Sequence, residues 1–318
     1  MTRIKYGIMG GASIVPRFVN GLKESRSSLA QAIATRSLEK TQKLATILDI
    51  PVVYDSYEEL VQDPELDIIY IPLWNKGHFA GAKLAIEHGK HVLLEKPFTL
   101  KSSEAAELFD LAKEKHVFLM EAQKAVFLPI MQEVKKRLEK GEIGEIEWVD
   151  VQQSHPGVEK IPWFDDVTAG GGAFIGSASY PLNVLQYLFG TGFDTANGIL
   201  THLPSKSDHK GQLILTKGNI LMSSLIATSF QLSSRLIIYG SKGVVTIPDY
   251  WKADKAMIET VNKTEQIDRP YQSEFVFEID HVATCLRSGR ITSSIMTSEM
   301  TLATVKVIEQ MYEGSFNK

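Results

Sequence analysis

Residues 7–15 read Gly7-Ile8-Met9-Gly10-Gly11-Ala12-Ser13-Ile14-Val15, within an apolar run that begins at Ile4. We expect a strand over residues 4–9 and a helix over 14–23, with Ser13 as its N-cap. Pro16 falls in the first turn of that helix, where its missing N–H does no harm. The glycines between strand and helix predict a tight turn, and the helix start behind it offers free N–H groups to a phosphate.

Short apolar runs and amphipathic stretches alternate from this turn to residue 121. The alternation predicts βαβ units, and therefore a Rossmann-type, doubly wound parallel sheet with helices on both faces. The expected strands after the first are 29–35, 52–54, 67–72, 91–94 and 117–120. The expected helices after the first are 38–48, a short one after Ser56, 79–88 and 103–115.

The pattern changes after residue 121. A helix is expected over 128–140 and a strand over 145–154, and a helical run follows the Gly-rich segment 169–172. Further strands are expected at 197–202, 212–216, 220–227, 236–239 and 244–247, and closing helices at 274–287 and 298–312. Close turns between neighbouring strands predict hairpins. We therefore predict an α+β domain with a large, mostly antiparallel open sheet, and two domains, 1–121 for dinucleotide binding and 122–318 for substrate binding and oligomerisation.

Composition narrows the class of protein. The chain has 318 residues, 44% hydrophobic and 23% charged, with a net charge of −4, which is typical of a globular enzyme. A basic stripe, as in a nucleic-acid binder, is lacking. No apolar run approaches the ~20 residues of a membrane span, and no signal peptide is visible, so we expect a cytoplasmic protein. His155, His202 and His209 form no metal-spaced cluster, so no catalytic metal is expected.

The turn at residues 10–15 matches a dinucleotide fingerprint only in part. Aligned on G-x-G-x-x-G from Gly10, the chain has Ala12 and Val15 at the second and third glycine positions. The second strand ends in Arg36 and Ser37 rather than in the acidic residue that binds the ribose of NAD. A guanidinium and a hydroxyl suit a 2′-phosphate, which favours NADP and leaves NAD open; a surface arginine and a helix cap are the alternative interpretation.

The fifth expected strand runs into Glu95-Lys96-Pro97-Phe98. Ligands of open α/β sheets bind at the carboxyl ends of the strands, so Lys96 is a candidate for proton transfer there. Pro97 restricts Lys96 to an extended conformation and is compatible with a cis peptide bond.

Taken together, these stretches resemble the Gfo/Idh/MocA oxidoreductases, particularly the branch of dimeric dihydrodiol dehydrogenase and D-xylose dehydrogenase. The resemblance covers essentially the whole chain. Besides the stretches above, it rests on Pro72-Leu73-Trp74-Asn75-Lys76-Gly77-His78, Met120-Glu121-Ala122, Gly170-Gly171-Gly172-Ala173 and Tyr180-Pro181-Leu182-Asn183.

The resemblance implies roles for these residues. Lys96 is expected to contact substrate and cofactor and to support proton transfer, and Tyr180 stands at the family's general acid/base position. Trp163 lines the substrate pocket in one interpretation and is a core aromatic residue in the other. The residues expected to bind cofactor are Gly10, Gly11, Ala12, Ser13, Ile14, Arg36, Ser37, Pro72, Asn75, His78, Glu95 and Lys96; those expected to bind substrate are Lys96, Trp163 and Tyr180.

Two departures from the family bear on activity. Gly176 stands where the family usually has an aspartate, and Gln123-Lys124-Ala125-Val126-Phe127 lacks the tryptophan and arginine usual in this branch. The first departure suggests weak turnover. The leading hypothesis is an NAD(P)-dependent oxidoreductase that moves a hydride between nicotinamide and a sugar, polyol or cyclic diol. The alternatives are a non-catalytic dinucleotide-binding regulator or sensor and a cofactor-free scaffold.

The partner expected besides a sugar- or polyol-like small molecule is a second copy of the chain. Oligomers of soluble proteins are most often C₂ dimers, so a homodimer is the simplest expectation. The interface is expected on the open face of the second sheet, at Leu213, Leu215, Leu221 and Leu225.

Overall fold

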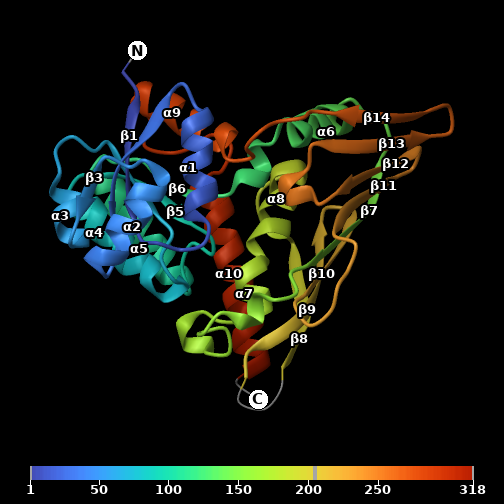
Figure 1. Ribbon diagram of the computed structural model, residues 1–318. Helices are drawn as coiled ribbons and strands as arrows, with labels where there is room; N and C mark the ends of the chain where they lie inside the picture. The colour runs from blue at the N-terminus through green and yellow to red at the C-terminus, as the bar shows by residue number, and fades with distance from the viewer. Residues whose placement is uncertain (1, 203–205, 317–318) are drawn as a thin grey trace. The chain divides into compact units, whose positions relative to one another are not determined.

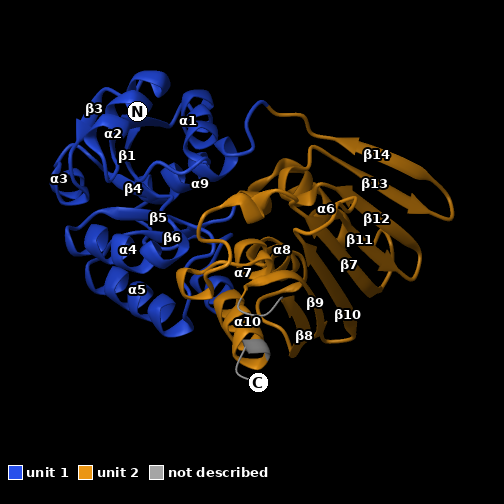
Figure 2. Ribbon diagram, turned by 60° about the horizontal axis from the view of Figure 1, so that its bottom comes forward, with its two compact units in different colours: residues 1–123, 272–302 blue, residues 124–271, 303–318 orange. Residues whose placement is uncertain are grey.

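The computed structural model describes residues 2–202 and 206–316. The chain divides into two compact units, coloured blue and orange in Figure 2. Unit 1 contains residues 1–123 and 272–302, and unit 2 contains 124–271 and 303–318. The predicted domain boundary at residue 121 stays a prediction.

Unit 1 is built on a six-stranded parallel sheet in the order β3-β2-β1-β4-β5-β6. Its strands are β1 (Ile4–Met9), β2 (Ser28–Ala34), β3 (Val52–Tyr54), β4 (Ile68–Ile71), β5 (His91–Glu95) and β6 (Leu119–Ala122). All four residues of β4 are buried, as expected for a strand with helices on both faces. The order reverses its direction at β1, so right-handed crossovers send the two sets of helices to opposite faces. The predicted doubly wound Rossmann sheet is confirmed.

The helices of unit 1 begin where short polar side chains can cap them. Ser37 accepts a hydrogen bond from the backbone of Lys40, and Ser56 accepts one from Glu59. The expected cap at Ser13 is wrong, because the first helix begins one residue later with Ile14 as its uncapped N-cap. The helices are α1 (Val15–Glu24), α2 (Leu38–Leu48), α3 (Tyr57–Gln62), α4 (His78–Glu87), α5 (Ser102–Glu114) and α9 (Val276–Arg287).

Helix α9 completes the core of unit 1 although it comes from the far end of the chain (Figure 1). The ring of Phe275, just before α9, packs edge-on against Phe18 of α1 at 5.9 Å between centroids. A Cβ atom on Gly21 of α1 would lie 2.6 Å from Cβ of Phe275, so the glycine permits this close approach. The N-terminal 123 residues therefore do not enclose their own core completely.

Unit 2 is built on an eight-stranded sheet in the order β14-β13-β12-β11-β7-β10-β9-β8. Only β7 and β10 pair in parallel; the other neighbours are antiparallel. The predicted open, mostly antiparallel sheet is confirmed, but the hairpin β13–β14 was missed. The strands are β7 (Ile146–Ser154), β8 (Thr195–His202), β9 (Asp208–Lys217), β10 (Ile220–Ala227), β11 (Arg235–Gly240), β12 (Gly243–Pro248), β13 (Lys255–Thr260) and β14 (Thr264–Asp268).

Helices pack on one face of the second sheet (Figure 1). They are α6 (Pro129–Glu139), α7 (Ala173–Ser177), α8 (Ser179–Phe189) and the unit 2 part of α10 (Ser298–Phe316). Leu213 and Leu215 lie on this covered face and are fully buried, so their expected place in an open-face interface is wrong. The period of two in a strand tells which side chains share a face, but not which face is covered.

The other face of this sheet is not covered by helices of its own unit. It exposes Ile214, Leu221 and Ile199, with 44%, 49% and 71% of their surfaces accessible. Leu221 therefore stays a candidate for the expected interface, and a homodimer stays a prediction.

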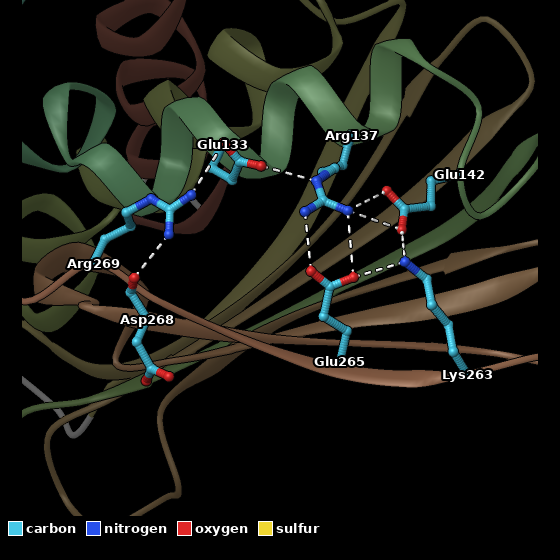
Figure 3. A network of polar contacts seen from close by, with 7 residues as sticks. All are labelled: Glu133, Arg137, Glu142, Lys263, Glu265, Asp268 and Arg269. Atoms are coloured by element: carbon cyan, nitrogen blue, oxygen red, sulfur yellow. Dashed lines mark hydrogen bonds and ion pairs between the residues drawn. The ribbon is translucent and has the colours of Figure 1, made fainter.

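A charged network joins α6 to the hairpin β13–β14 (Figure 3). The guanidinium of Arg137 contacts Glu133 at 2.8 Å, Glu142 at 3.0 Å and Glu265 of β14 at 3.0 Å. Lys263 pairs with both Glu142 and Glu265, at 2.8 and 2.7 Å. Each carboxylate thus has at least one cationic partner at hydrogen-bond distance, and the network fixes the hairpin to the helix.

Replacing Arg137 with Met is expected to destabilise unit 2 by about 1–2 kcal/mol, because three charge-assisted contacts are lost and the side chain is mostly buried. Arg137 lowers the pKa of Glu133, and Lys263 with Arg137 lowers that of Glu142, from an ordinary value of 4.5. Lowered carboxyl pKa values stabilise the fold above that ordinary value and lose this effect as the pH falls through the lowered values. The thermal midpoint should therefore fall on acidification below about pH 4.5, and less steeply in Arg137→Met. Calorimetry from pH 3 to 7 measures both; equal pH slopes for the two proteins would contradict the prediction.

Candidate active site

The turn after β1 is shaped by Gly10. Its φ of +123° lies in the region that side chains disfavour. A Cβ atom there would lie 3.0 Å from a methyl group of Leu73 and 3.2 Å from the carbonyl oxygen of Pro72. The glycine therefore lets the turn after β1 pass close to the segment that follows β4.

Backbone donors gather at the end of this turn. In the described residues, no hydrogen bond uses the N–H of Gly11, Ala12, Ser13 or Ile14, whereas Gly10 donates to Ala34 and Val15 donates to Ala12. These four donors precede α1, whose N-terminus carries a partial positive charge. They can bind a phosphate group.

Two cations lie near the turn. Arg36 follows β2 and is exposed, and its charge lowers the pKa of nearby Tyr57, which burial raises. Lys40, in the first turn of α2, was not predicted: its Cε lies 3.5 Å from the position of a Cβ atom on Gly11. Arg36 lies just before the N-cap of α2 and Lys40 lies in its first turn, and this proximity in sequence was the signal available. Ser37 is exposed beside them, although its hydroxyl caps α2.

The segment after β4 carries Pro72, Asn75 and His78. Asn75 and His78 are buried. The Nδ1 atom of His78 lies 2.7 Å from the carbonyl oxygen of Pro97, and Nε2 lies 3.1 Å from that of Leu73. Burial lowers the pKa of this imidazole, so the neutral form prevails at neutral pH and donates to one of the two carbonyls. His78 thus links the segment after β4 to the residue that follows Lys96.

Lys96 directly follows β5 in unit 1. The peptide bond from Lys96 to Pro97 is cis, as the sequence allowed. Burial lowers the pKa of the ammonium, and the negative charges of Glu95 and Glu121 oppose this shift. Glu95 is held by the hydroxyl of Tyr70 at 2.7 Å and by the backbone N–H of Lys96 at 3.1 Å. The result is a positioned lysine that can exchange a proton more readily than an exposed one.

Tyr180 lies in the first turn of α8 in unit 2 and is partly exposed. The glycines before it set the position of the preceding helix α7. At Gly172, where φ is +131°, a Cβ atom would collide with the carboxylate of Asp208 and the hydroxyl of Tyr312. Asp208 accepts a hydrogen bond from the backbone N–H of Phe174 at 2.7 Å and another from Tyr312. The Gly-rich segment is therefore required for the packing that supports α7 and α8.

A lysine that sequence reasoning did not assign lies beside Tyr180. Lys124 is 4% exposed, and its Nζ atom lies 5.7 Å from the centroid of the Tyr180 ring. Tyr250, fully buried, also lies near Tyr180, because a charge on Tyr180 contributes to the raised pKa of Tyr250 after burial. Tertiary packing alone brings these residues together from three segments of unit 2.

The remaining expected residues have separate surroundings. Trp163 is partly exposed, and its backbone carbonyl accepts a hydrogen bond from Asp166. Asp165, two residues after Trp163, is exposed and pairs with Lys206 at 2.7 Å. A Cβ atom on Gly176 would meet no other atom within 4 Å, so this helix has room for a side chain there.

The expected residues thus fall into two groups. The carboxyl ends of β1, β2, β4 and β5, adjacent and parallel strands of unit 1, carry the turn residues, Arg36, Asn75 and Lys96. Tyr180 and Trp163 belong to unit 2. Across residues 2–202 and 206–316, no cluster of three His, Cys, Asp or Glu side chains is arranged to hold a metal ion. Within the same ranges, no helix has the length and apolar character needed to cross a membrane.

Comparison with known proteins agrees with this geometry. Residues 4–123 match the family model of oxidoreductases with an NAD-binding Rossmann fold, and residues 131–246 match the GFO/IDH/MocA C-terminal domain. The trans-1,2-dihydrobenzene-1,2-diol dehydrogenase of Xenopus laevis is 30% identical, with 96% of this chain and 98% of that protein covered. The scyllo-inositol 2-dehydrogenase (NADP(+)) IolU of Bacillus subtilis is 29% identical, with 96% and 95% covered.

A solved structure shares the fold. KijD10, a 3-ketoreductase from Actinomadura kijaniata in complex with NADP and TDP-benzene, superposes with a TM-score of 0.88 at 23% identity, covering 99% of this chain and 98% of that one. A Rossmann unit with free backbone donors, followed by an open-sheet unit, defines an NAD(P)-dependent oxidoreductase. The chain belongs to the Gfo/Idh/MocA family. The comparisons give no support to the expectation of weak turnover.

Proposed function

We propose that the chain is an NADP-dependent dehydrogenase or reductase of a polyol, sugar or cyclic diol. The observation that carries the proposal is the set of functional groups at one edge of the first sheet. Four backbone donors, the exposed Arg36 and the positioned Lys96 follow the carboxyl ends of parallel strands. These groups fit the pyrophosphate, 2′-phosphate and nicotinamide ends of one extended dinucleotide.

The names of the relatives support the substrate class. The Xenopus relative is a dehydrogenase of a cyclic diol, and the Bacillus relative is an NADP⁺-dependent dehydrogenase of an inositol. Both substrates carry neighbouring hydroxyl groups on a six-membered ring. We infer that this chain accepts a compound with adjacent hydroxyl or keto groups.

In this proposal the protein binds, orients and moves a proton. A bound nicotinamide supplies hydride exchange with a carbinol or carbonyl carbon. Lys96 hydrogen-bonds to the oxygen on that carbon and stabilises negative charge as it develops there. The hydroxyl of Tyr180 takes up or returns the proton of that oxygen. Glu95 orients Lys96, and His78 keeps the turn that carries it in place.

The test combines binding with turnover. Calorimetric titration with NADPH and NADH comes first, and a spectrophotometric screen of inositols, aldoses, other polyols and cyclic diols follows with NADP⁺. We expect tighter binding of the phosphorylated cofactor and turnover of at least one vicinal diol. Binding without turnover of any compound would favour the non-catalytic sensor, and no binding would reject both functions.

Replacing Arg36 with Ala is expected to weaken NADPH binding about 10- to 150-fold and to leave NADH binding nearly unchanged. One charge-assisted hydrogen bond contributes roughly 1.5–3 kcal/mol, and only NADPH carries the 2′-phosphate. The matched control is Arg26→Ala, an exposed arginine that precedes the amino end of β2. Equal losses for both cofactors, or equal affinity of the parent protein for them, would contradict the role of Arg36.

A further inference from the structure

Lys124 is an unusual residue to find inside unit 2. It begins the 3₁₀ turn Lys124–Phe127, all of whose residues are buried. Its ammonium donates a hydrogen bond to the backbone carbonyl of Trp251 at 3.3 Å. Removing an ammonium from water is costly. Each favourable interaction that a buried ammonium makes offsets part of that cost.

The aromatic ring of Tyr180 provides such an interaction. At 5.7 Å from the ring centroid, the ammonium is within the range of cation–π attraction. The same geometry acts more strongly on the ionised phenol, because a full negative charge then faces the cation. Lys124 is 4% exposed and Tyr180 is partly exposed, so water screens this pair less than it screens two surface groups.

A second titratable group of unit 2 near Tyr180, the phenol of Tyr250, does not oppose this effect. Tyr250 reaches it from the 3₁₀ turn Tyr250–Lys252, and burial holds the pKa of Tyr250 well above its ordinary value. Its hydroxyl donates to Gln153, whose amide contacts the His155 ring at 2.6 Å. Tyr250 thus stays neutral near pH 7. Lys96, the lysine named in the proposed function, belongs to unit 1.

We propose that Lys124 is a positioning residue for Tyr180, which holds the phenol in place and favours its ionised form. This inference rests on the proposed function only for its consequence in catalysis. The branch of the family that this chain resembles usually has a tryptophan, not a lysine, at position 124. The role inferred for Lys124 therefore does not follow from the resemblance. It also gives Tyr180 a charged partner in its own unit.

The ionisation of Tyr180 tests the inference without any substrate. Full-length protein labelled with ¹³C at the tyrosine Cζ atom is titrated by NMR, and Tyr180→Phe assigns the signal. We expect Lys124→Met to raise the pKa of Tyr180 by about one unit or more, and Lys124→Arg to restore most of the difference. The matched control is Lys135→Met, because Lys135 lies over the ring of Tyr187 on the same helix, at 4.3 Å. It should leave Tyr180 unchanged.

An unchanged pKa of Tyr180 in a folded Lys124→Met protein overturns the inference, whatever the activity. An equal shift in Lys135→Met overturns it as well, because the effect would then not be local. If a substrate is found, the rise of kcat/KM with pH in NADP⁺-dependent oxidation, in which ionised Tyr180 takes up the proton, should move to higher pH in Lys124→Met by the same amount as the NMR titration. Failure to find turnover would leave the NMR result valid and would count against the proposed function alone.

Discussion

Replacing Tyr180 with Phe is expected to lower kcat by about 10²- to 10⁴-fold, the usual contribution of a positioned general acid or base. The substitution removes one hydroxyl and keeps the ring that packs against Lys124, so the fold should persist. Binding of NADPH should change less than about twofold, because the residues proposed to hold the cofactor belong to unit 1. Steady-state kinetics with a working substrate and calorimetry with NADPH measure the two effects.

The control for Tyr180→Phe is Tyr187→Phe, two turns along the same helix. The ammonium of Lys135 lies over the ring of Tyr187, as that of Lys124 lies near the ring of Tyr180. Tyr187→Phe therefore measures the structural effect of removing a phenol hydroxyl from α8. We expect its kcat to stay near the parental value. A Tyr180→Phe variant with parental kcat would show that this hydroxyl neither gives nor takes the proton.

Replacing Lys96 with Met is expected to lower kcat/KM by about 10²-fold or more, through both a smaller kcat and a larger KM. The ammonium is proposed to contact the reacting oxygen, so its loss weakens substrate binding as well as the transition state. The loss also removes the positive charge that interacts with Glu95 and Glu121.

Lys101→Met provides the comparison. Lys101 is an exposed lysine five residues later, at the start of α5, and it has no proposed role in the site. Circular dichroism and the thermal midpoint identify any loss of fold in Lys96→Met. If the folded Lys96→Met protein keeps the parental kcat and KM, Lys96 has no part in the chemistry.

Local sequence predicted most of the fold. The strand over residues 220–227 and the helix over 38–48 have the predicted bounds, because apolar periodicity and a capping serine determine them locally. The hairpin β13–β14 was missed because its buried side is marked only by Ala256, Ile258 and Ile267, and its turn at Val261-Asn262-Lys263 lacks glycine and proline. This hairpin is stabilised by pairing with the rest of the sheet and by the contact of Glu265 with Arg137, and the sequence of the hairpin alone shows neither interaction.

The candidate site was predictable where it follows strands. Arg36 and Lys96 could be found because residues at the carboxyl ends of parallel strands share one edge of the sheet. Lys124 could not be found in this way. Its contact with Tyr180 joins residues 56 positions apart, and the periodicities of helices and strands relate only residues within one element. The covered face of the second sheet was likewise undetermined until α7 was seen to pack on it.

The place of α9 in unit 1 has a consequence for biosynthesis. A ribosome delivers residues 1–123 early, but Phe275, which packs against Phe18 and Gly21, emerges only after residues 124–271 have been synthesised. Until then the nascent Rossmann sheet exposes the apolar surface that α9 will cover. The first unit can therefore be completed only after most of unit 2 has been translated, and a chain stalled after residue 271 should be a substrate for chaperones.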